Sequence, residues 1–144
     1  MIDYASCLWD NCSGANLKIL NRMYKKAVKL LLLKQSSPTL TDYKRINILT
    51  FHNRLFFNKA TFMFNVINGN APTKIADTFK TNPHRHKNVL AFPRPRNNLF
   101  KSSLLYSGGT LWNSLPAALK KIRNKNNFKS KLKSFLFTKN INDD

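Results

Sequence analysis

Apolar residues recur at three- and four-residue steps early in the chain, which is the spacing of one face of an α-helix. The stripe consists of Leu17, Leu20, Tyr24, Ala27, Val28 and Leu31. Much of the remaining surface of this helix is cationic, with Lys18, Arg22, Lys25, Lys26 and Lys29. Ser13 is suited to the N-cap. We expect the helix to end in residues 35–38, because Pro38 disfavours a helical residue before it.

Similar patterns predict two helices in the following segment. A short helix is expected over residues 40–46, with Thr39 or Thr41 and Asp42 at its start. A longer helix is expected over residues 51–67, with Thr50 as a candidate cap. Its apolar face is so broad that we expect it to be the central helix of the fold.

The C-terminal half predicts shorter helices and one more amphipathic helix. Short helices are expected from Pro72 to about residue 79 and from Pro116 to about residue 122, since proline is favourable in a first turn. A last basic helix is expected after Asn126 or Asn127 as N-cap. Its apolar residues are Phe128, Leu132, Phe135 and Leu136.

The segment between these helical regions has a different pattern. Residues 81–99 contain three of the six prolines and no sustained helical stripe. Short strands are expected over residues 89–92 and 100–106, and Gly108 with Gly109 is expected to open a turn. We therefore predict a mainly α-helical single domain over residues 1–144, with a short irregular or β element around residues 89–106. Its parts are a helical region at about 13–80, a basic proline-containing loop at 81–99 and a C-terminal helical region at 107–139.

Trp112 has two possible roles in this fold. It is an anchor of the core, or it is an exposed ring on which a nucleic-acid base stacks. The residue lies between leucines, in the run Leu111-Trp112-Asn113-Ser114-Leu115, and an indole in such surroundings is more often a core side chain. We expect Trp112 to hold the scaffold together with Phe64, Leu115 and Phe128.

The charge balance restricts the partner. The chain has 25 Lys and Arg residues against 6 Asp and no Glu, which gives a net charge of +19. Two stretches contain only basic charges, with six cations in residues 79–101 and eight in residues 117–139. Such a surface attracts polyanions. We expect RNA or DNA as the partner, with an anionic membrane as a less favoured one.

The expected contacts are cations that grip phosphates without reading sequence. Arg94 and Arg96 lie two residues apart in an extended segment, so both can project to one side. A guanidinium can fork onto a phosphate or stack on a base. The alternative is a loop whose cations serve solubility alone. The expected nucleic-acid-binding residues are Arg94, Arg96, Lys101, Lys120, Lys121, Arg123, Lys129 and Lys133.

The sequence speaks against an enzyme, a cofactor or a small-molecule substrate. Metal-dependent polymerases and nucleases need clustered carboxylates, whereas the aspartates are scattered over separate predicted elements. No glycine-rich phosphate loop is present. The set Cys7, Cys12, His84 and His86 has the spacing of no common zinc site, so we expect no metal. Two isolated cysteines without a signal peptide indicate an intracellular protein, in a cytoplasmic ribonucleoprotein or the nucleus.

Five segments resemble the C-terminal region of reverse transcriptases from non-LTR (LINE-type, jockey-like) retrotransposons. They are "IDYASCLWDNCS", "NVINGNAP", "FPRPRN", "YSGGTLWNSLP" and "NNFKSKLKSFL". They occur in the order that this family has and cover nearly the whole chain. The more specific part is "LWNSLP" followed by "FKSKLK".

The resemblance implies a C-terminal, thumb-adjacent module that grips template RNA, primer or target DNA. In that family the polymerase motif with its two aspartates lies upstream of the matching region, so no catalytic residue is carried over and the reading frame is expected to be a truncated copy. The missing polymerase domain is then a further expected partner. Two alternatives stay open: an inert decayed fragment, and a peripheral membrane protein that uses the basic helix at residues 127–137.

Overall fold

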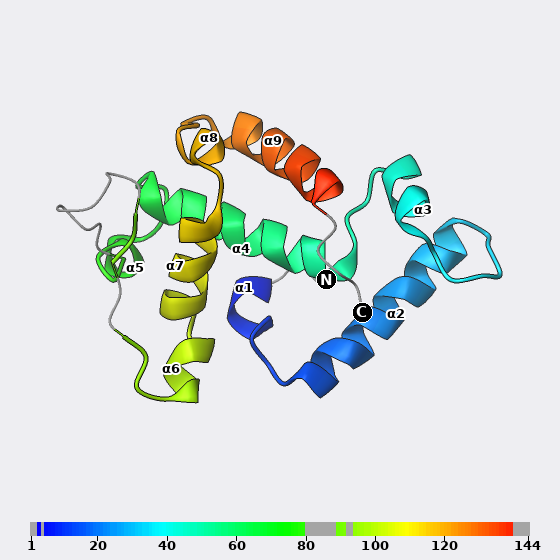
Figure 1. Ribbon diagram of the computed structural model, residues 1–144, viewed down its shortest axis with the longest axis horizontal. Helices are drawn as coiled ribbons and strands as arrows, with labels where there is room; N and C mark the ends of the chain where they lie inside the picture. The colour runs from blue at the N-terminus through cyan, green and yellow to red at the C-terminus, as the bar shows by residue number, and fades with distance from the viewer. Residues whose placement is uncertain (1–2, 4, 80–88, 92–93, 140–144) are drawn as a thin grey trace.

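The computed structural model describes residues 3, 5–79, 89–91 and 94–139. Helices account for most of these residues, and no sheet forms among them (Figure 1). The helices are α1 (Ser6–Trp9), α2 (Gly14–Leu31), α3 (Leu40–Arg45), α4 (Phe51–Ile67), α5 (Thr73–Ala76), α6 (Asn98–Ser102), α7 (Leu104–Ser114), α8 (Ala117–Lys120) and α9 (Lys125–Thr138). The prediction of a mainly α-helical fold is confirmed.

Helix α4 is the central helix, as its broad apolar face predicts. It contacts α1, α2, α5, α7 and α9, and it runs across the middle of the molecule with α9 on one side (Figure 1). Ala60, Met63 and Phe64 are completely buried. Because α4 contacts so many elements, it fixes the directions in which the other helices present their polar faces.

The core forms where α4, α7 and α9 meet. The rings of Phe64 and Phe128 stack with their centroids 4.4 Å apart, and the ring of Trp112 lies 6.1 Å from that of Phe128. Trp112 is 2% exposed and Leu115 is 4% exposed. The indole is therefore packed inside the protein, where it cannot serve as a stacking platform for a base.

The prediction of a strand over residues 100–106 is wrong. These residues belong to α6 and α7, which are capped by the side chains of Asn97 and Ser103. The other expected strand, over residues 89–92, lies partly outside the described residues. Within the described part of that segment, Leu90 alone makes a β-type backbone pairing. Of the loop predicted over 81–99, residues 89–91 and 94–99 are described. Residues 89–91 and 94–97 contain no helix, whereas residues 98 and 99 already belong to α6.

Gly108 and Gly109 lie within α7 and do not form the expected turn. A Cβ atom on Gly108 would come within 2.8 Å of the sulfur of Met63 in α4. The missing side chain therefore allows α7 to approach α4 closely, and this packing outweighs the low helix propensity of glycine.

Several helix boundaries also differ from those expected. Helix α2 ends at Leu31, before the expected 35–38, because Leu33 turns the chain with a φ of 50°. The N–H of Lys34 then closes the helix end on the carbonyl of Lys29. Helix α9 begins after Asn124, whose side chain accepts from the N–H groups of residues 126 and 127. The short α1 has no counterpart in the sequence prediction.

Within the part of the chain that the structure describes, none of the helices combines the length and the hydrophobicity needed to cross a bilayer.

Candidate nucleic-acid interface

Five cations from one face of α2 line a groove of about 460 Å³. They are Lys18, Arg22, Lys25, Lys26 and Lys29, and Asn21, Ser37 and Pro38 complete the lining. From Lys18 to Lys29 the helix rises by about 16 Å. That length spans several phosphates of a nucleic acid, which has one phosphate per strand for about every 3.4 Å of duplex axis. We call this surface the α2 groove.

Contacts on another side of α2 orient its cationic face toward solvent. Ser13 caps the helix by accepting from the N–H of Asn16. The hydroxyl of Tyr24 donates to the carbonyl of Leu49 over 2.7 Å, and Val28 is 2% exposed. These contacts hold one apolar edge of α2 against the start of α4, so the lysines and Arg22 face solvent.

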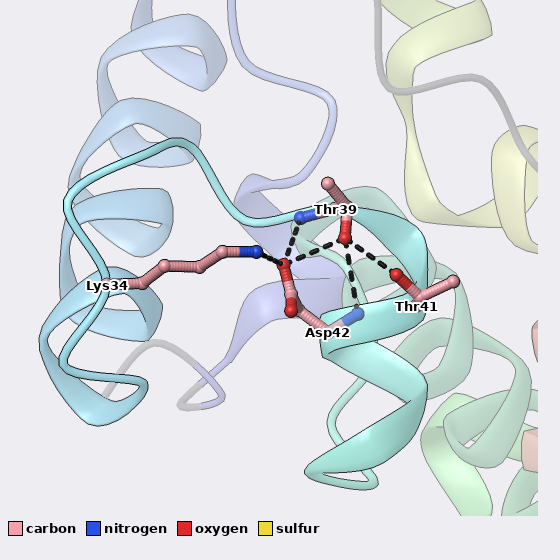
Figure 2. Close-up of polar contacts among 4 residues, drawn as sticks. All are labelled: Lys34, Thr39, Thr41 and Asp42. Atoms are coloured by element: carbon pink, nitrogen blue, oxygen red, sulfur yellow. Dashed lines mark hydrogen bonds and ion pairs between the residues drawn. The ribbon is translucent and has the colours of Figure 1, made fainter.

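The wall of the groove is set by the connection from α2 to α3, which a single carboxylate organises (Figure 2). Oδ2 of Asp42 accepts from Nζ of Lys34 over 2.7 Å. The same oxygen accepts from the N–H and from the hydroxyl of Thr39, each over 2.8 Å. The lysine contact, followed by the two threonine contacts, holds the pKa of Asp42 well below its usual value. The connection that carries Ser37 and Pro38 is thereby fixed beside α2.

A second basic cavity lies just before and along α6. Arg94, Arg96, Asn97 and Phe100 line about 310 Å³, and both arginines are exposed. Lys101 follows Phe100 directly and is also exposed. Guanidinium groups beside an aromatic ring can bind a phosphate and stack a base in the same place. We call this surface the α6 cavity.

Asn113 anchors the segment that leads into the α6 cavity. Its amide accepts from the N–H of Leu90 over 2.9 Å and donates to the carbonyl of Leu90 over 3.0 Å. Leu90 itself is 4% exposed. Asn113 follows Trp112 on α7, so the same short stretch of sequence fills the core and fastens the chain four residues before Arg94.

The cations of α8 and its end have mixed roles. Nζ of Lys120 donates to the carbonyl of Asn113 over 2.8 Å, and burial lowers the pKa of Lys120. This ammonium satisfies the end of α7, which argues against its predicted phosphate contact. Lys121 is exposed. Arg123 is exposed too and reaches the side-chain oxygen of Asn68 over 3.4 Å.

Lys129 and Lys133 lie one helical turn apart on α9. Lys129 lines a shallow groove of about 260 Å³ whose lining includes Phe62 and Asn65 of α4, and Nζ of Lys133 lies 5.9 Å from the ring centroid of Phe137. Three apolar side chains of this helix are in the core: Phe128, Leu132 and Leu136 are at most 1% exposed. Phe135 and Phe137 are partly buried against that core, so the core already uses much of the apolar face that a membrane role for the helix at residues 127–137 would need.

Three of the described carboxylates pair with cations that lie outside the α2 groove and the α6 cavity. Asp3 pairs with Arg54, Asp10 with Lys59 and Asp42 with Lys34. The hydrogen bond from Arg54 is the main reason that the pKa of Asp3 falls to about 2. In the described residues, no ion pair with a carboxylate involves a cation of the α2 groove or of the α6 cavity. Their positive charge is left available to an external anion.

The predicted binding residues form separate groups in the structure. Arg94 and Arg96 line one cavity, whose Phe100 is followed in sequence by Lys101, and Lys129 and Lys133 lie one turn apart on α9. Helices α2 and α6 lie toward opposite ends of the long axis of the molecule (Figure 1). The α2 groove was not among the predicted sites, although its spacing of four, three and four residues between Lys18, Arg22, Lys25 and Lys29 is visible in the sequence. Its wall at Ser37 and Pro38 becomes apparent only once the chain folds back.

The thiols give no sign of a metal site in the described part. Cys7 and Cys12 are free, and burial raises the pKa of Cys7. His84 and His86, the other two residues of the zinc set that the sequence raised, lie outside the described residues. Among the described residues, no three metal-ligating side chains come together.

Comparisons with protein-family models, with curated proteins and with solved structures found no match. The resemblance to the retrotransposon reverse transcriptases stays a prediction.

Proposed function

We propose that this chain binds the phosphate backbone of RNA or DNA, as the C-terminal, thumb-adjacent part of a non-LTR retrotransposon reverse transcriptase without its catalytic palm. The observation that carries the binding proposal is the α2 groove. Five cations line it along about three helical turns, and no carboxylate is present anywhere in α2. Phosphate contacts of this kind hold a strand without reading its sequence.

The α6 cavity supports the same proposal with different chemistry. Arg94 and Arg96 offer forked donors, and Phe100 offers an aromatic face. The two surfaces lie far apart, so together they suit a long polymer better than a small anion. Lys121, Arg123, Lys129 and Lys133 add cations along α8 and α9 between those two ends (Figure 1).

The family part of the proposal rests on the five resembling segments. Two of them form α7 with its C-terminal end and most of α9, which supply Trp112 and Phe128 to the core. The genomic DNA upstream of the codon for Met1 tests this part. An upstream reading frame with the polymerase motif is expected, and unrelated sequence there would contradict the family assignment.

The binding proposal is tested by two variants that remove the same amount of charge. In the groove variant, Arg22, Lys25 and Lys29 are replaced by Gln. In the control variant, Lys44, Arg45 and Lys74 are replaced by Gln; these three are exposed and lie outside the α2 groove. Fluorescence anisotropy with a labelled duplex and a labelled single-stranded RNA gives the affinity at each salt concentration.

We expect the affinity of the unchanged chain to fall about a thousandfold between 50 and 200 mM salt, as for about six phosphate contacts. The groove variant should lose about three from the slope of log affinity against log salt, since each phosphate contact contributes about one. The control variant should keep the slope. Equal behaviour of both variants, or an affinity that salt does not change, would contradict the proposal and favour the inert fragment.

A further inference from the structure

Helix α2 and the turn that follows it expose a strip of large apolar side chains, here called the α2 strip. Its members are Ile19 (56% exposed), Met23 (60%), Leu30 (75%), Leu31 (69%) and Leu33 (94%). Scattered exposed leucines are common on proteins. These five differ because they belong to one helix and its end.

The helical spacing places the members of the strip beside one another. Met23 follows Ile19 by four residues, and Leu30 and Leu31 follow Met23 by seven and eight. Residues so spaced share a face of the helix. Ala27, which lies between them on that face, is exposed as well. The apolar arc of α2 thus has one edge packed on α4 and another edge open to solvent.

The turn after α2 holds the end of the strip outward. Leu33 has a φ of 50°, and the next residue, Lys34, is tied to Asp42 of α3 (Figure 2). The connection from α2 to α3 protrudes at one end of the molecule (Figure 1). Leu33 therefore lies in a protruding connection that the ion pair of the next residue ties to α3, with its side chain 94% exposed.

Cations border the strip. Arg22 follows Ile19 by three residues, and Lys26 follows Met23 by three and precedes Leu30 by four, so both flank the strip on the helix surface. Helix α2 contains no acidic residue. A second copy of the chain is a poor occupant, because pairing two strips would bring these cations together without a carboxylate to offset them.

We propose that the α2 strip lies in the interface of an anionic lipid bilayer, with Leu30, Leu31 and Leu33 among the acyl chains and Arg22 and Lys26 at the lipid phosphates. A helix with an apolar strip, a cationic border and no acid has the composition of an interfacial helix. The long stems of these cations can reach the headgroups while the strip is immersed.

A bilayer fits these observations better than a protein partner does. In a stable protein–protein interface each partner typically contributes about 20–30 residues. The α2 strip has five apolar side chains, which is too few for such an interface. A bilayer needs no shape-matched surface. The inference does not depend on nucleic-acid binding, and it assigns the lipid contact to α2, whereas the sequence alone suggested the last helix.

The experiment must separate insertion from simple adsorption, because any chain of +19 charge adsorbs to an anionic surface. Flotation with vesicles of phosphatidylcholine and phosphatidylserine is measured at low salt and at about 1 M salt, where the Debye length is about 3 Å. The test variant is Leu30→Gln with Leu33→Gln, and Met23→Gln is a second, independent one. The control is Leu8→Gln with Leu99→Gln, which changes two leucines that are 66% and 81% exposed elsewhere.

We expect the unchanged chain and the control to keep a salt-resistant fraction on the vesicles. The partition coefficient of the double variant in the strip should fall at least about tenfold, because the favourable transfer of two leucine side chains from water to the bilayer is lost. The single variant Met23→Gln should lose less. Circular dichroism checks that all variants stay helical. Complete release of the unchanged chain by salt, equal losses in the strip and control variants, or a strip-dependent dimer in analytical ultracentrifugation would each overturn the inference.

Discussion

At the scale of single residues, the least expected feature is a buried ion pair. Nζ of Lys59 in α4 lies 2.8 Å from Oδ2 of Asp10, and their side chains are 6% and 7% exposed. The ammonium also donates to Asn11 and to Ser107, each over 3.2 Å. This network joins α4 to the end of α1 and to α7. Burial raises the pKa of Asp10 even though Lys59 lies beside it.

We predict that Lys59→Ala lowers the free energy of unfolding by about 3–5 kcal/mol, because it leaves the Asp10 carboxylate buried without its cation. Oδ1 of Asp10 already has no hydrogen-bond partner among the described residues. Urea unfolding followed by circular dichroism measures the loss. The matched control replaces Lys59 by Met and Asp10 by Leu together, which removes both charges and should recover most of the stability. A single variant within about 1 kcal/mol of the unchanged chain would contradict this role.

The sequence could not reveal this pair, since Asp10 and Lys59 lie in distant segments and neither belongs to a motif. Trp112 is the opposite case. Its apolar neighbours Leu111 and Leu115 pointed to the core, where the structure places it. The residues next to a side chain in sequence predict whether it is buried. They do not predict which group from a distant segment it will contact.

At the scale of elements, two of the predicted caps are confirmed: Ser13 and Thr39 cap α2 and α3. Thr50 makes no capping hydrogen bond with its side chain, and α9 is capped by Asn124 instead of Asn126 or Asn127. Gly108 and Gly109 predict a turn from their residue type. They are helical instead, because the absence of a side chain at Gly108 lets α7 pack closely against Met63 of α4. The side chains of Asn97 and Ser103 cap α6 and α7. Both residue types favour helix caps, but the strand-like pattern of residues 100–106 predicts a strand there instead. The same limit applies to the candidate site. The spacing of the α2 cations can be seen in the sequence, but the position of Ser37 and Pro38 beside them, which closes the groove, depends on the fold.

The connection from α2 to α3 gives a prediction in pH. The pKa of Asp42 is lower in the folded chain than the ordinary value of about 3.9, so its contribution to stability is complete above about pH 4 and is lost as the pH falls below that value. We expect Asp42→Asn to be less stable than the unchanged chain at pH 7, and the difference to shrink toward pH 2. Thermal unfolding across this range measures it.

Asp77→Asn is the control for that pH series, since Asp77 is exposed at the end of α5. It removes a carboxylate that belongs to none of the ion pairs of the described residues, so a change that both variants share is not assigned to the Lys34 contact. A constant gap between Asp42→Asn and the unchanged chain from pH 7 to pH 2 would contradict the assignment, because a purely structural effect of the substitution does not titrate with the carboxylate.

At the scale of the whole molecule, the excess of positive charge has two consequences of opposite sign. With 25 basic and 6 acidic residues, the folded chain repels itself, and the same charge attracts a polyanion. The few carboxylates serve the interior and the helix connections through Asp10 and Asp42. In the described residues, the cations of the α2 groove and of the α6 cavity have no carboxylate partner, so the fold is kept compact by its core and not by charge balance.

Salt should therefore stabilise the chain while it weakens nucleic-acid binding. Raising sodium chloride from about 0.01 M to about 1 M shortens the Debye length from about 30 Å to about 3 Å, which screens the repulsion among the cations. We expect the melting temperature to rise, with a gain of about 1 kcal/mol corresponding to about 4 °C for a chain of this size. The variant with Arg22, Lys25 and Lys29 replaced by Gln has less repulsion to relieve, so its rise should be smaller. A melting temperature that falls with salt would contradict this prediction, because it would mean that exposed ion pairs such as Arg54 with Asp3 stabilise the fold more than the net charge destabilises it.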